Sequence, residues 1–361
     1  MIPHTASWQE FCKKELAVLQ PLLSKLGFAL EETQVHLGGE RSVISGKKLV
    51  LMGYRVTDHA RVIIKASTHP EGKKELIHGH TCRALLNQIQ FAYTVFLSPE
   101  ELVWHEEDGC LISISTYIEQ TSTFLDRPFK EQFFLALKAF ETQESAHATT
   151  YEHARAIRGT FGLFDTSDYL AKFTEHCKTI LNGLPTHQEI SALLERASSF
   201  LQASQDRIEQ YNGFLTHTDF VPHNIRIVDR DIYLLDHSAI HFGNKYEGWA
   251  RFLNFMLLYH RELEQALITY VEQNRSPEER EALQLMRVYR LAELIAYYVK
   301  RLPKTEGDLH ALDQARVFFW IDVLRSLLDE KTLPQERITT YQTLRDSLRS
   351  DEEKKRQKGL H

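Results

Sequence analysis

One β-prone segment, Phe214 to His237, interrupts a sequence that has a helical pattern almost throughout from Phe129 onward. Within it, the runs 224–228 and 231–235 flank Asp229-Arg230, which is typical of a β-hairpin. Capping patterns predict helix starts on both sides of the segment: Thr186 with Glu189, and Ser276-Pro277 with Glu279. The C-terminal two thirds of the chain is therefore predicted to be a helical domain with one inserted hairpin.

The first 117 residues have a different pattern. Ser7 and Glu10 form a capping box that predicts an opening helix. The β-prone runs 34–37, 48–56 and 60–66 predict an antiparallel meander, and a helix is expected over 71–90. Two further β-prone runs, 94–98 and 110–118, are separated by the acidic turn 106–109. We expect an α+β chain with a sheet-containing part over 1–117, a helical part over 118–349 and a charged, disordered tail over 350–361.

Composition excludes several classes of protein. The 43 Lys and Arg residues against 49 Asp and Glu residues give a formal net charge of -6, so no overall positive field attracts nucleic acid. The four cysteines form no CxxC pair, and none of the 18 histidines lies in an HExxH motif or a Cys/His cluster, which argues against zinc. No apolar run approaches the length of a membrane span, and no signal peptide is recognisable. We expect a soluble, cytoplasmic protein, and nothing in the sequence indicates an oligomeric state.

Polar side chains of one chemical kind gather on the predicted hairpin. His217 and Asp219 precede it, Asn224 follows five residues after the aspartate, and Asp236 ends the second strand. Phosphoryl transfer from MgATP needs oxygen ligands for Mg²⁺ and a carboxylate that accepts the proton of the attacking hydroxyl. The hairpin brings Asp236 back beside Asn224, which fits that requirement. Asp and Asn are also ordinary turn residues, so the spacing alone could arise by chance.

A lysine in the N-terminal part strengthens this interpretation. Lys65 ends the apolar run Val62-Ile63-Ile64, where a kinase lysine would reach the α- and β-phosphates with support from a carboxylate on the next helix. Glu75 is the first candidate for that carboxylate, and Glu71 is the second. The alternative is that Lys65 is simply solvated and that both acids favour the helix N-terminus.

The segments HTDFVPHNIRI and YLLDHS resemble the HGDxxPxN and IDxx segments of the aminoglycoside phosphotransferase and choline kinase-like family of small-molecule kinases. The resemblance implies a bilobal, protein-kinase-like fold, ATP and Mg²⁺ as cofactors, and a small-molecule hydroxyl as phosphate acceptor. The roles that it implies are as follows: Asp219 is the catalytic base, Asn224 and Asp236 are the metal ligands, Lys65 binds phosphate, His217 braces the loop, and the run from Thr116 through Tyr117 and Ile118 to Glu119 is the adenine-binding hinge.

Three features depart from that family's pattern. Thr218 stands where glycine is usual, and a β-branched residue would be strained there if φ is positive. The run 246–250 has Glu247 and Gly248 where the family tends to carry an aspartate before a helix. The phosphate loop is undecided between Gly38, Gly39 and Ser42 on one side and Ser45-Gly46-Lys47 on the other.

These departures leave a second function open, a nucleotide-binding regulatory module with impaired catalysis. A protein kinase is disfavoured because no DFG or APE motif follows Asp236. For the acceptor, possible polar contacts are Asp165, Asp168, His241 and Glu247.

Overall fold

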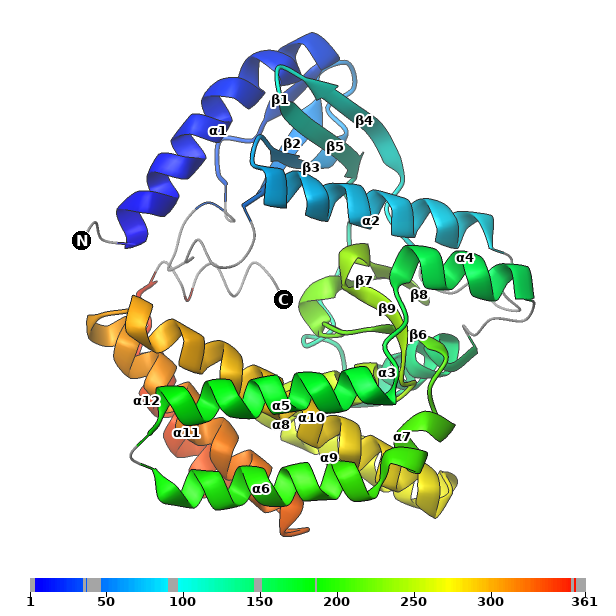
Figure 1. The fold of residues 1–361 in the computed structure, drawn as a ribbon. Helices are drawn as coiled ribbons and strands as arrows, with labels where there is room; N and C mark the ends of the chain where they lie inside the picture. Colours follow the sequence, from blue (N-terminus) through cyan, green and yellow to red (C-terminus); the bar gives the residue numbers. More distant parts are fainter. Residues whose placement is uncertain are drawn as a thin grey trace.

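The computed structural model describes residues 4–34, 37, 47–89, 97–145, 151–185, 187–351 and 354 (Figure 1). The N-terminal elements are α1 (His4–Leu26), β1 (Phe28–Leu30), β2 (Leu49–Arg55), β3 (Arg61–Ser67), α2 (Pro70–Gln88), β4 (Glu101–Glu107) and β5 (Cys110–Thr116). The strands form one antiparallel sheet in the order β1-β2-β3-β5-β4. The expected α+β class with an antiparallel N-terminal sheet is confirmed.

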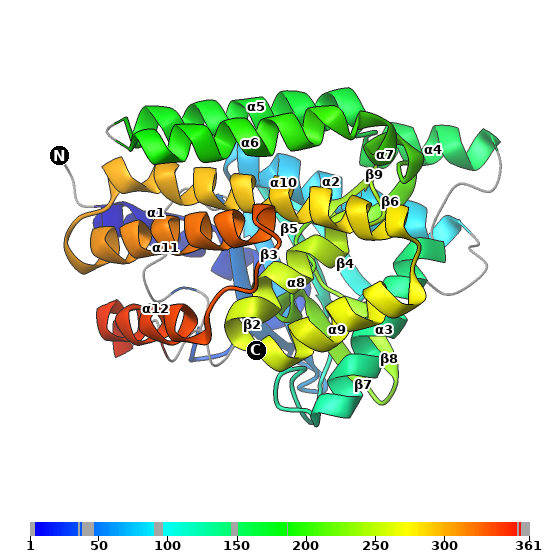
Figure 2. The same ribbon diagram turned by 90° about the horizontal axis from the view of Figure 1, so that it is seen from below.

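The rest of the described chain is mostly helical. Its elements are α3 (Phe129–Ser145), α4 (Tyr151–Phe161), α5 (Thr166–Gly183), α6 (Gln188–Ala203), α7 (Gln205–Gln210), β6 (Phe214–His217), η1 (Pro222–Asn224), β7 (Ile225–Val228), β8 (Asp231–Leu234), η2 (His237–Ala239), β9 (Ile240–Gly243), α8 (Glu247–Tyr259), α9 (Arg261–Asn274), α10 (Pro277–Arg301), η3 (Leu302–Lys304), α11 (Gly307–Leu328) and α12 (Gln335–Leu348). Helix α10 packs against α5, α8 and α11, which makes it the central helix of this part (Figure 2).

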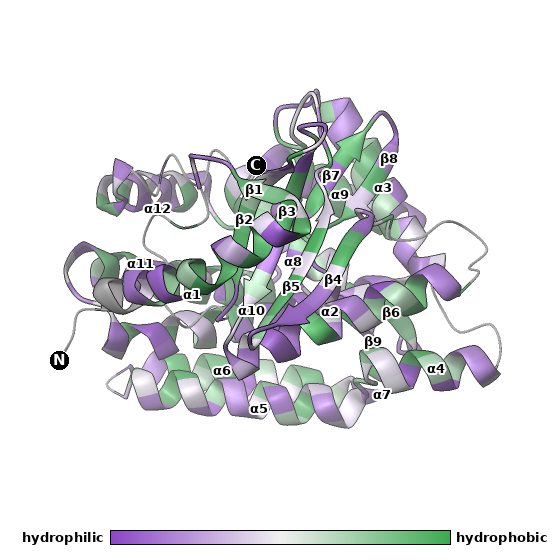
Figure 3. Ribbon diagram, turned by 90° about the horizontal axis from the view of Figure 1, so that it is seen from above, coloured by the Kyte–Doolittle hydropathy of each residue, from purple (hydrophilic) through white to green (hydrophobic). Residues whose placement is uncertain are grey.

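Side-chain alternation in the sheet decides which residues face the helical part. Val62, Ile64 and Ala66 of β3 are buried in an apolar cluster with Leu19, Leu22 and Leu23 of α1. Successive side chains of a strand point to opposite faces, so Lys65 lies on the face away from α1. Figure 3 shows α1 and the sheet with their apolar and polar residues interleaved along each element.

Several expected boundaries were wrong. Helix α1 begins at His4, before the predicted capping box at Ser7, and Phe28–Leu30 is a strand that no pattern indicated. Gln34 and Leu37 of the run 34–37 are not in a strand, and most of 94–98 lies outside the described residues. The strand that forms a hairpin with β5 is instead β4, and α6 starts at Gln188 with His187 at its N-cap.

Three other expectations, on α2, on the β7-β8 hairpin and on the start of α10, were confirmed. Helix α2 spans most of 71–90, the β7-β8 hairpin turns at Asp229-Arg230, and Ser276 with Glu279 forms a capping box at the start of α10. Of the predicted disordered tail 350–361, only residues 350, 351 and 354 lie within the described residues, so that expectation stays a prediction. In the part of the chain that the structure covers, no helix is both long and apolar enough to cross a membrane.

Candidate active site

The β7-β8 hairpin holds three polar side chains close together. Strand β6 ends at His217, the turn at Pro222–Asn224 leads into β7, and β8 ends at Leu234, two residues before Asp236. The backbone amide of Leu235 donates a 3.0 Å hydrogen bond to the carbonyl oxygen of Asn224. Asp236 is therefore carried back beside Asn224, as the sequence predicted.

Both carboxylate oxygens of Asp219 accept hydrogen bonds. The side-chain nitrogen of Asn224 donates to Oδ2 at 2.9 Å and to the Asp219 backbone carbonyl at 2.9 Å. Arg251 of α8 donates to Oδ1 from Nε at 3.0 Å, and its Nη2 lies 2.9 Å from the same oxygen in an ion pair. The Asp219 side chain is nevertheless 46% exposed, so it is oriented and still reachable by a substrate.

The charge of Asp219 follows from these partners. Burial alone would raise the pKa of Asp219, but neighbouring positive charges, with Arg251 foremost and Arg290 adding to it, together outweigh burial and hold that pKa below its ordinary value. The group is therefore an ionised carboxylate at neutral pH. No signal in the sequence linked Arg251 to Asp219, because the contact joins a loop to a helix 32 residues further along the chain.

Asn224 and Asp236 are the two side chains at this place that could supply oxygen ligands to a hard cation. Because the Asn224 amide nitrogen is held by Asp219, its carbonyl oxygen is turned to the other side and is available as a ligand. Asp236 accepts a 2.6 Å hydrogen bond from the Ser238 hydroxyl at Oδ1. Mg²⁺ is usually bound by one or two protein oxygens together with waters and substrate phosphates. The described residues include no group of three or more His, Cys, Asp or Glu side chains suited to a metal.

Lys65 reaches the hairpin from the sheet. Its Nζ lies 3.5 Å from the carbonyl oxygen of Leu235, next to Asp236. Burial lowers the pKa of Lys65, and the nearby cation of Lys48 lowers it further. Burial alone would raise the pKa of Asp236, but Lys48 and Lys65 outweigh it and hold that pKa far below the ordinary value. The structure thus joins the predicted lysine to the predicted metal ligands.

The expected ion pair between Lys65 and Glu75 is absent. Glu75 is paired with Lys48, which lies just before β2, and Glu71 is paired with Lys47 at 3.2 Å. The physical reason is in the sheet register. Val50 lies opposite Lys65, so Lys48, two residues earlier and on the same face, comes between Lys65 and the start of α2.

Lys48 is the functional candidate that sequence reasoning missed. The backbone beside it is fixed, because the carbonyl of Lys47 accepts a 2.6 Å hydrogen bond from the Ser67 hydroxyl. That carbonyl also lies so near Gly72 that a Cβ on residue 72 would come within 2.3 Å of it. Only glycine fits at this position of α2. The doublet Lys47-Lys48 before an apolar strand was the one available signal.

The loop around Thr218 is not strained. Within the described ranges, positive φ at non-glycine residues occurs only at His59, Asp108, Asp229 and Glu330. Thr218 donates from its amide at 2.8 Å and from its hydroxyl at 2.9 Å to the carbonyl of Ala239. The threonine therefore tethers the loop to the segment after Asp236, and the expected cost of replacing glycine does not arise.

Arg290 of α10 also supports the loop around Thr218. Its Nη2 donates a 2.6 Å hydrogen bond to the carbonyl of Thr218, and its Nη1 lies 3.1 Å from Oε1 of Glu247. Glu247 is 1% exposed and also accepts from Tyr169 and His241 at 2.6 Å each. Burial alone would raise the pKa of Glu247, but His241 and Arg290 outweigh it and lower the pKa to about 2. Glu247 is thus a buried anion that fixes Arg290.

Gly248 has a packing role. A Cβ at this position would lie 2.8 Å from Oε1 of Gln143 and 3.3 Å from the hydroxyl of Thr216. The amide of Gly248 donates to that hydroxyl at 3.1 Å. The first turn of α8 can therefore approach β6 closely, and the run 246–250 departs from the family pattern without leaving the loop unsupported.

Two histidines below the loop are neutral. Burial lowers the pKa of His217, and it lowers the pKa of His237 to about 3. His217 is completely buried and stacks edge-on against Phe220. This placement is consistent with a bracing role and with no role in proton transfer.

Other predicted contacts lie elsewhere. Asp165 and Asp168 form the capping box of α5, and His241 and Glu247 belong to the buried group below the loop, so these four side chains serve the fold. Gly38, Gly39 and Ser42 lie outside the described residues, as do Ser45 and Gly46. At the expected hinge, the Tyr117 ring lies under the Arg61 guanidinium, 4.2 Å from centroid to carbon, and its amide donates to the Arg61 carbonyl at 3.2 Å.

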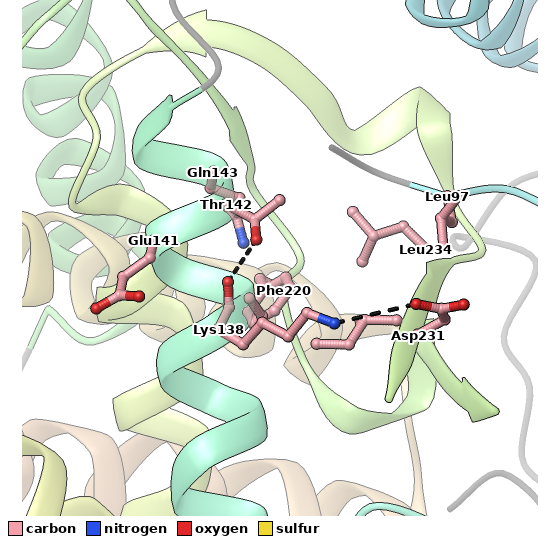
Figure 4. A pocket seen from close by; sticks show the side chains of 10 residues that line it. Leu97, Lys138, Glu141, Thr142, Gln143, Phe220, Asp231 and Leu234 are labelled. Carbon is pink, nitrogen blue, oxygen red and sulfur yellow. Dashed lines mark hydrogen bonds and ion pairs between the residues drawn. The ribbon is translucent and has the colours of Figure 1, made fainter. Parts of the chain in front are cut away.

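A cavity of about 590 Å³ lies on the far side of the hairpin (Figure 4). Lys138, Thr142 and Gln143 of α3 line one wall with Phe220 beside them, and Leu97, Asp231 and Leu234 lie across from them. Asp219, Asn224 and Asp236 are not among the residues that line it. The cavity is therefore distinct from the site assembled by these three side chains.

Comparison with known proteins bears on the fold. No protein family model and no curated protein sequence matches the chain. Solved structures do. The apo form of a thermostable mutant of aminoglycoside phosphotransferase APH(4)-Ia has a TM-score of 0.55 at 14% identity, over 84% of this chain and 97% of that chain.

Two other structures agree with this result. Macrolide 2'-phosphotransferase MphH from Brachybacterium faecium has a TM-score of 0.52 at 15% identity, over 84% of this chain and 97% of that one. ADP-bound aminoglycoside phosphotransferase APH(2'')-Ib has a TM-score of 0.54 at 13% identity, over 87% and 97%. The chain therefore has the kinase-like fold of the aminoglycoside and macrolide phosphotransferases.

Proposed function

We propose that this protein is an ATP- and Mg²⁺-dependent phosphotransferase that moves the γ-phosphoryl group to a hydroxyl of a small molecule. The observation that carries the proposal is the convergence of four groups from two parts of the chain. Asp219, Asn224 and Asp236 lie together on the hairpin, and Lys65 reaches them from the sheet. These are the residue types that phosphoryl transfer requires, in a common place.

The proposed reaction transfers the γ-phosphoryl group of ATP directly to the acceptor hydroxyl. The acceptor hydroxyl binds to Asp219, its oxygen forms a bond to the γ-phosphorus, and the bond from that phosphorus to the bridging oxygen breaks. The hydroxyl proton passes to Asp219, and ADP leaves with the bridging oxygen. Asn224 and Asp236 would hold Mg²⁺, which neutralises charge on the phosphate oxygens when it is bound. Catalysis on this account is mainly positioning and charge neutralisation.

Similar proteins support a nucleotide donor. A solved complex of an APH(4)-Ia mutant contains AMP-PNP with hygromycin B, and one of APH(2'')-IIa contains ATP with streptomycin. For this chain we place the adenine at Tyr117 and Ile118, since the amide of Ile118 donates no hydrogen bond to any described residue. We place the phosphates between Lys65 and a loop that includes Gly38, Gly39 and Ser42. Glu75 would support this place through its ion pair with Lys48. The boundary between the two lobes would then fall near residue 117, with the second lobe extending to about 349.

The test is a phosphorylation screen over small alcohols, amino sugars and aminoglycosides, read as Mg²⁺-dependent ADP release, together with thermal unfolding in ATP with and without Mg²⁺. We expect MgATP to raise the unfolding temperature and at least one acceptor to be phosphorylated. Stabilisation without turnover of any acceptor would favour the regulatory module. No stabilisation and no turnover would overturn the proposal.

Lys48 provides a sharper test on the nucleotide side. Replacing it with methionine (Lys48→Met) removes a cation that faces Asp236 and the expected phosphate position, so we expect affinity for MgATP to fall about tenfold, as for loss of one charge-assisted hydrogen bond. Isothermal titration measures the change.

Lys25 is the matched control for this test, because it also pairs with a carboxylate, Glu107 at 2.7 Å, but at the surface and outside the proposed site. Lys25→Met should leave the affinity for MgATP within about twofold of the unchanged protein. Equal effects of the two substitutions would mean that Lys48 has no special role.

A further inference from the structure

Arg251 has hydrogen-bonding capacity that the fold does not use. A guanidinium presents two forked edges, one with Nε and one Nη nitrogen, the other with both Nη nitrogens. Asp219 occupies the first edge of Arg251, through Nε and Nη2. Nη1 donates to no described residue, and the side chain is 22% exposed. The second fork is therefore open beside the carboxylate that would hold the attacking hydroxyl.

The position of this open fork indicates which ligand it would bind, the acceptor or the nucleotide. The metal-binding side of Asp219 is marked by Asn224, which donates to Oδ2. Arg251 binds the opposite oxygen, Oδ1, and it comes from α8 in the helical part. Lys65 and Lys48 already supply positive charge on the phosphate side, next to Asp236. Arg251 therefore lies where the acceptor would bind.

Arg290, the other arginine that acts on Asp219, is already paired. Arg290 is taken up by Glu247 at 3.1 Å and by Glu293 at 2.7 Å, and its Nη2 donates to the loop backbone. An open guanidinium fork binds a carboxylate or a phosphate through two parallel hydrogen bonds. These charge-assisted bonds are stronger than hydrogen bonds to neutral groups. A cationic acceptor gains nothing from this fork.

We infer that the phosphate acceptor carries an anionic group, a carboxylate or a phosphate, close to the hydroxyl that is phosphorylated, and that Arg251 binds this group. The inference rests on the proposed function and narrows its substrate class from any small hydroxyl compound to hydroxy acids and phosphorylated polyols.

The test uses the full chain with MgATP and two matched acceptor series. One series is glycerol, glycerate, glycerol phosphate and aminopropanediol, and the other is glucose, gluconate, glucose phosphate and glucosamine. ADP release reports turnover, and thermal unfolding with MgADP reports binding. We expect the anionic members of at least one series to exceed the neutral and cationic members about tenfold or more in kcat/KM. The carboxylate and phosphate arms show which of the two anions is preferred.

The outcomes separate this inference from the proposed function. If neutral or cationic members are phosphorylated better than anionic ones, the inference is wrong and the proposed function stands. If MgATP stabilises the protein but no anionic member is turned over or adds stabilisation, the inference is also wrong. Without stabilisation by MgATP or any turnover, the proposed function itself fails.

Variants of Arg251 assign the effect to the side chain. Arg251→Gln should raise the KM for an anionic acceptor about 10- to 100-fold, with the KM for ATP changed less than about twofold. Arg251→Lys keeps the positive charge but lacks the fork, so its KM for an anionic acceptor should lie between those of the unchanged protein and Arg251→Gln. Arg261→Gln is the control, because Arg261 is also partly buried and paired with a carboxylate, Glu264, but lies on α9. A rise in the KM for ATP in Arg251→Gln would instead assign the guanidinium to the γ-phosphate and overturn the inference.

Discussion

Replacing Asp219 with asparagine should reduce phosphoryl transfer by about 10²- to 10⁴-fold, the contribution expected of a general base, while MgATP binding stays within about threefold. Asparagine has nearly the shape of aspartate but accepts no proton. Single-turnover transfer to the acceptor found in the screen measures the first quantity, and titration with MgATP measures the second. The two readouts together separate a chemical role from a binding role.

The control for this prediction is Asp229→Asn, the same change in the turn of the same hairpin. Asp229 is exposed and has a φ of 53°, a conformation that asparagine also adopts readily. The turnover of Asp229→Asn should match that of the unchanged protein. Unchanged turnover in Asp219→Asn, or an equal loss in both variants, would contradict the role assigned to Asp219.

The ionisation of Asp219 sets the pH range in which the turnover of these variants can be compared without a contribution from its titration. Its folded-state pKa is lowered, chiefly by Arg251 acting against burial, so the carboxylate is ionised above its ordinary titration range. The reactive form is lost only as the pH falls through the lowered value. Between pH 6 and 8, turnover should not change through Asp219, and differences between the variants then reflect chemistry.

The β7-β8 hairpin could be predicted from sequence because its geometry is local. Asn224 lies five residues after Asp219, and one hairpin returns Asp236 to the same place, so strand pairing alone brings them together. The face of Lys65 could be read in the same way from strand alternation. Where hydrogen bonds between near neighbours decide the structure, the spacing of residues is enough.

Contacts between distant segments could not be predicted. The assignment of Glu75 to Lys65 failed because the register of β2 against β3 places Lys48 beside Glu75, and no pattern in one strand specifies that register. Arg251 was missed because its partner lies on another element. The expected strain at Thr218 depended on a φ value that residue identity does not fix.

These contacts also explain how the site tolerates its unusual residues. In the loop that carries Asp219, the Thr218 hydroxyl donates to Ala239 of η2 and the Thr218 carbonyl accepts from Arg290 of α10, while the Gly248 amide of α8 donates to Thr216 of β6 just before the loop. The loop is thus supported from η2, α8 and α10 together. The departures at Thr218 and at 246–250 therefore change which residues hold the loop, and the groups that would perform phosphoryl transfer remain in place.

Replacing Asp236 with asparagine should abolish the Mg²⁺ dependence of nucleotide binding and lower turnover about 100-fold or more, since metal coordination contributes several kcal/mol at the transition state and each 1.36 kcal/mol is a factor of ten. Asp236 is the carboxylate ligand of the proposed set, and Asn224 alone supplies only a neutral oxygen. The measurement is thermal unfolding with ATP, with and without Mg²⁺. The unchanged protein should show a larger rise with Mg²⁺ than without it, and the variant should show the same rise in both.

The substitution also removes an anion that Lys48 and Lys65 face, so the ligand-free unfolding temperature must be compared first. Asp231→Asn, at the exposed start of β8 with Lys138 4.0 Å away, controls for changing charge on this hairpin and should keep the Mg²⁺ effect. If Asp236→Asn folds and retains a full Mg²⁺-dependent rise, the metal does not bind at Asp236 and Asn224. The lysines would then have to hold the phosphates unaided, and Asp236 would serve only to keep Lys65 charged.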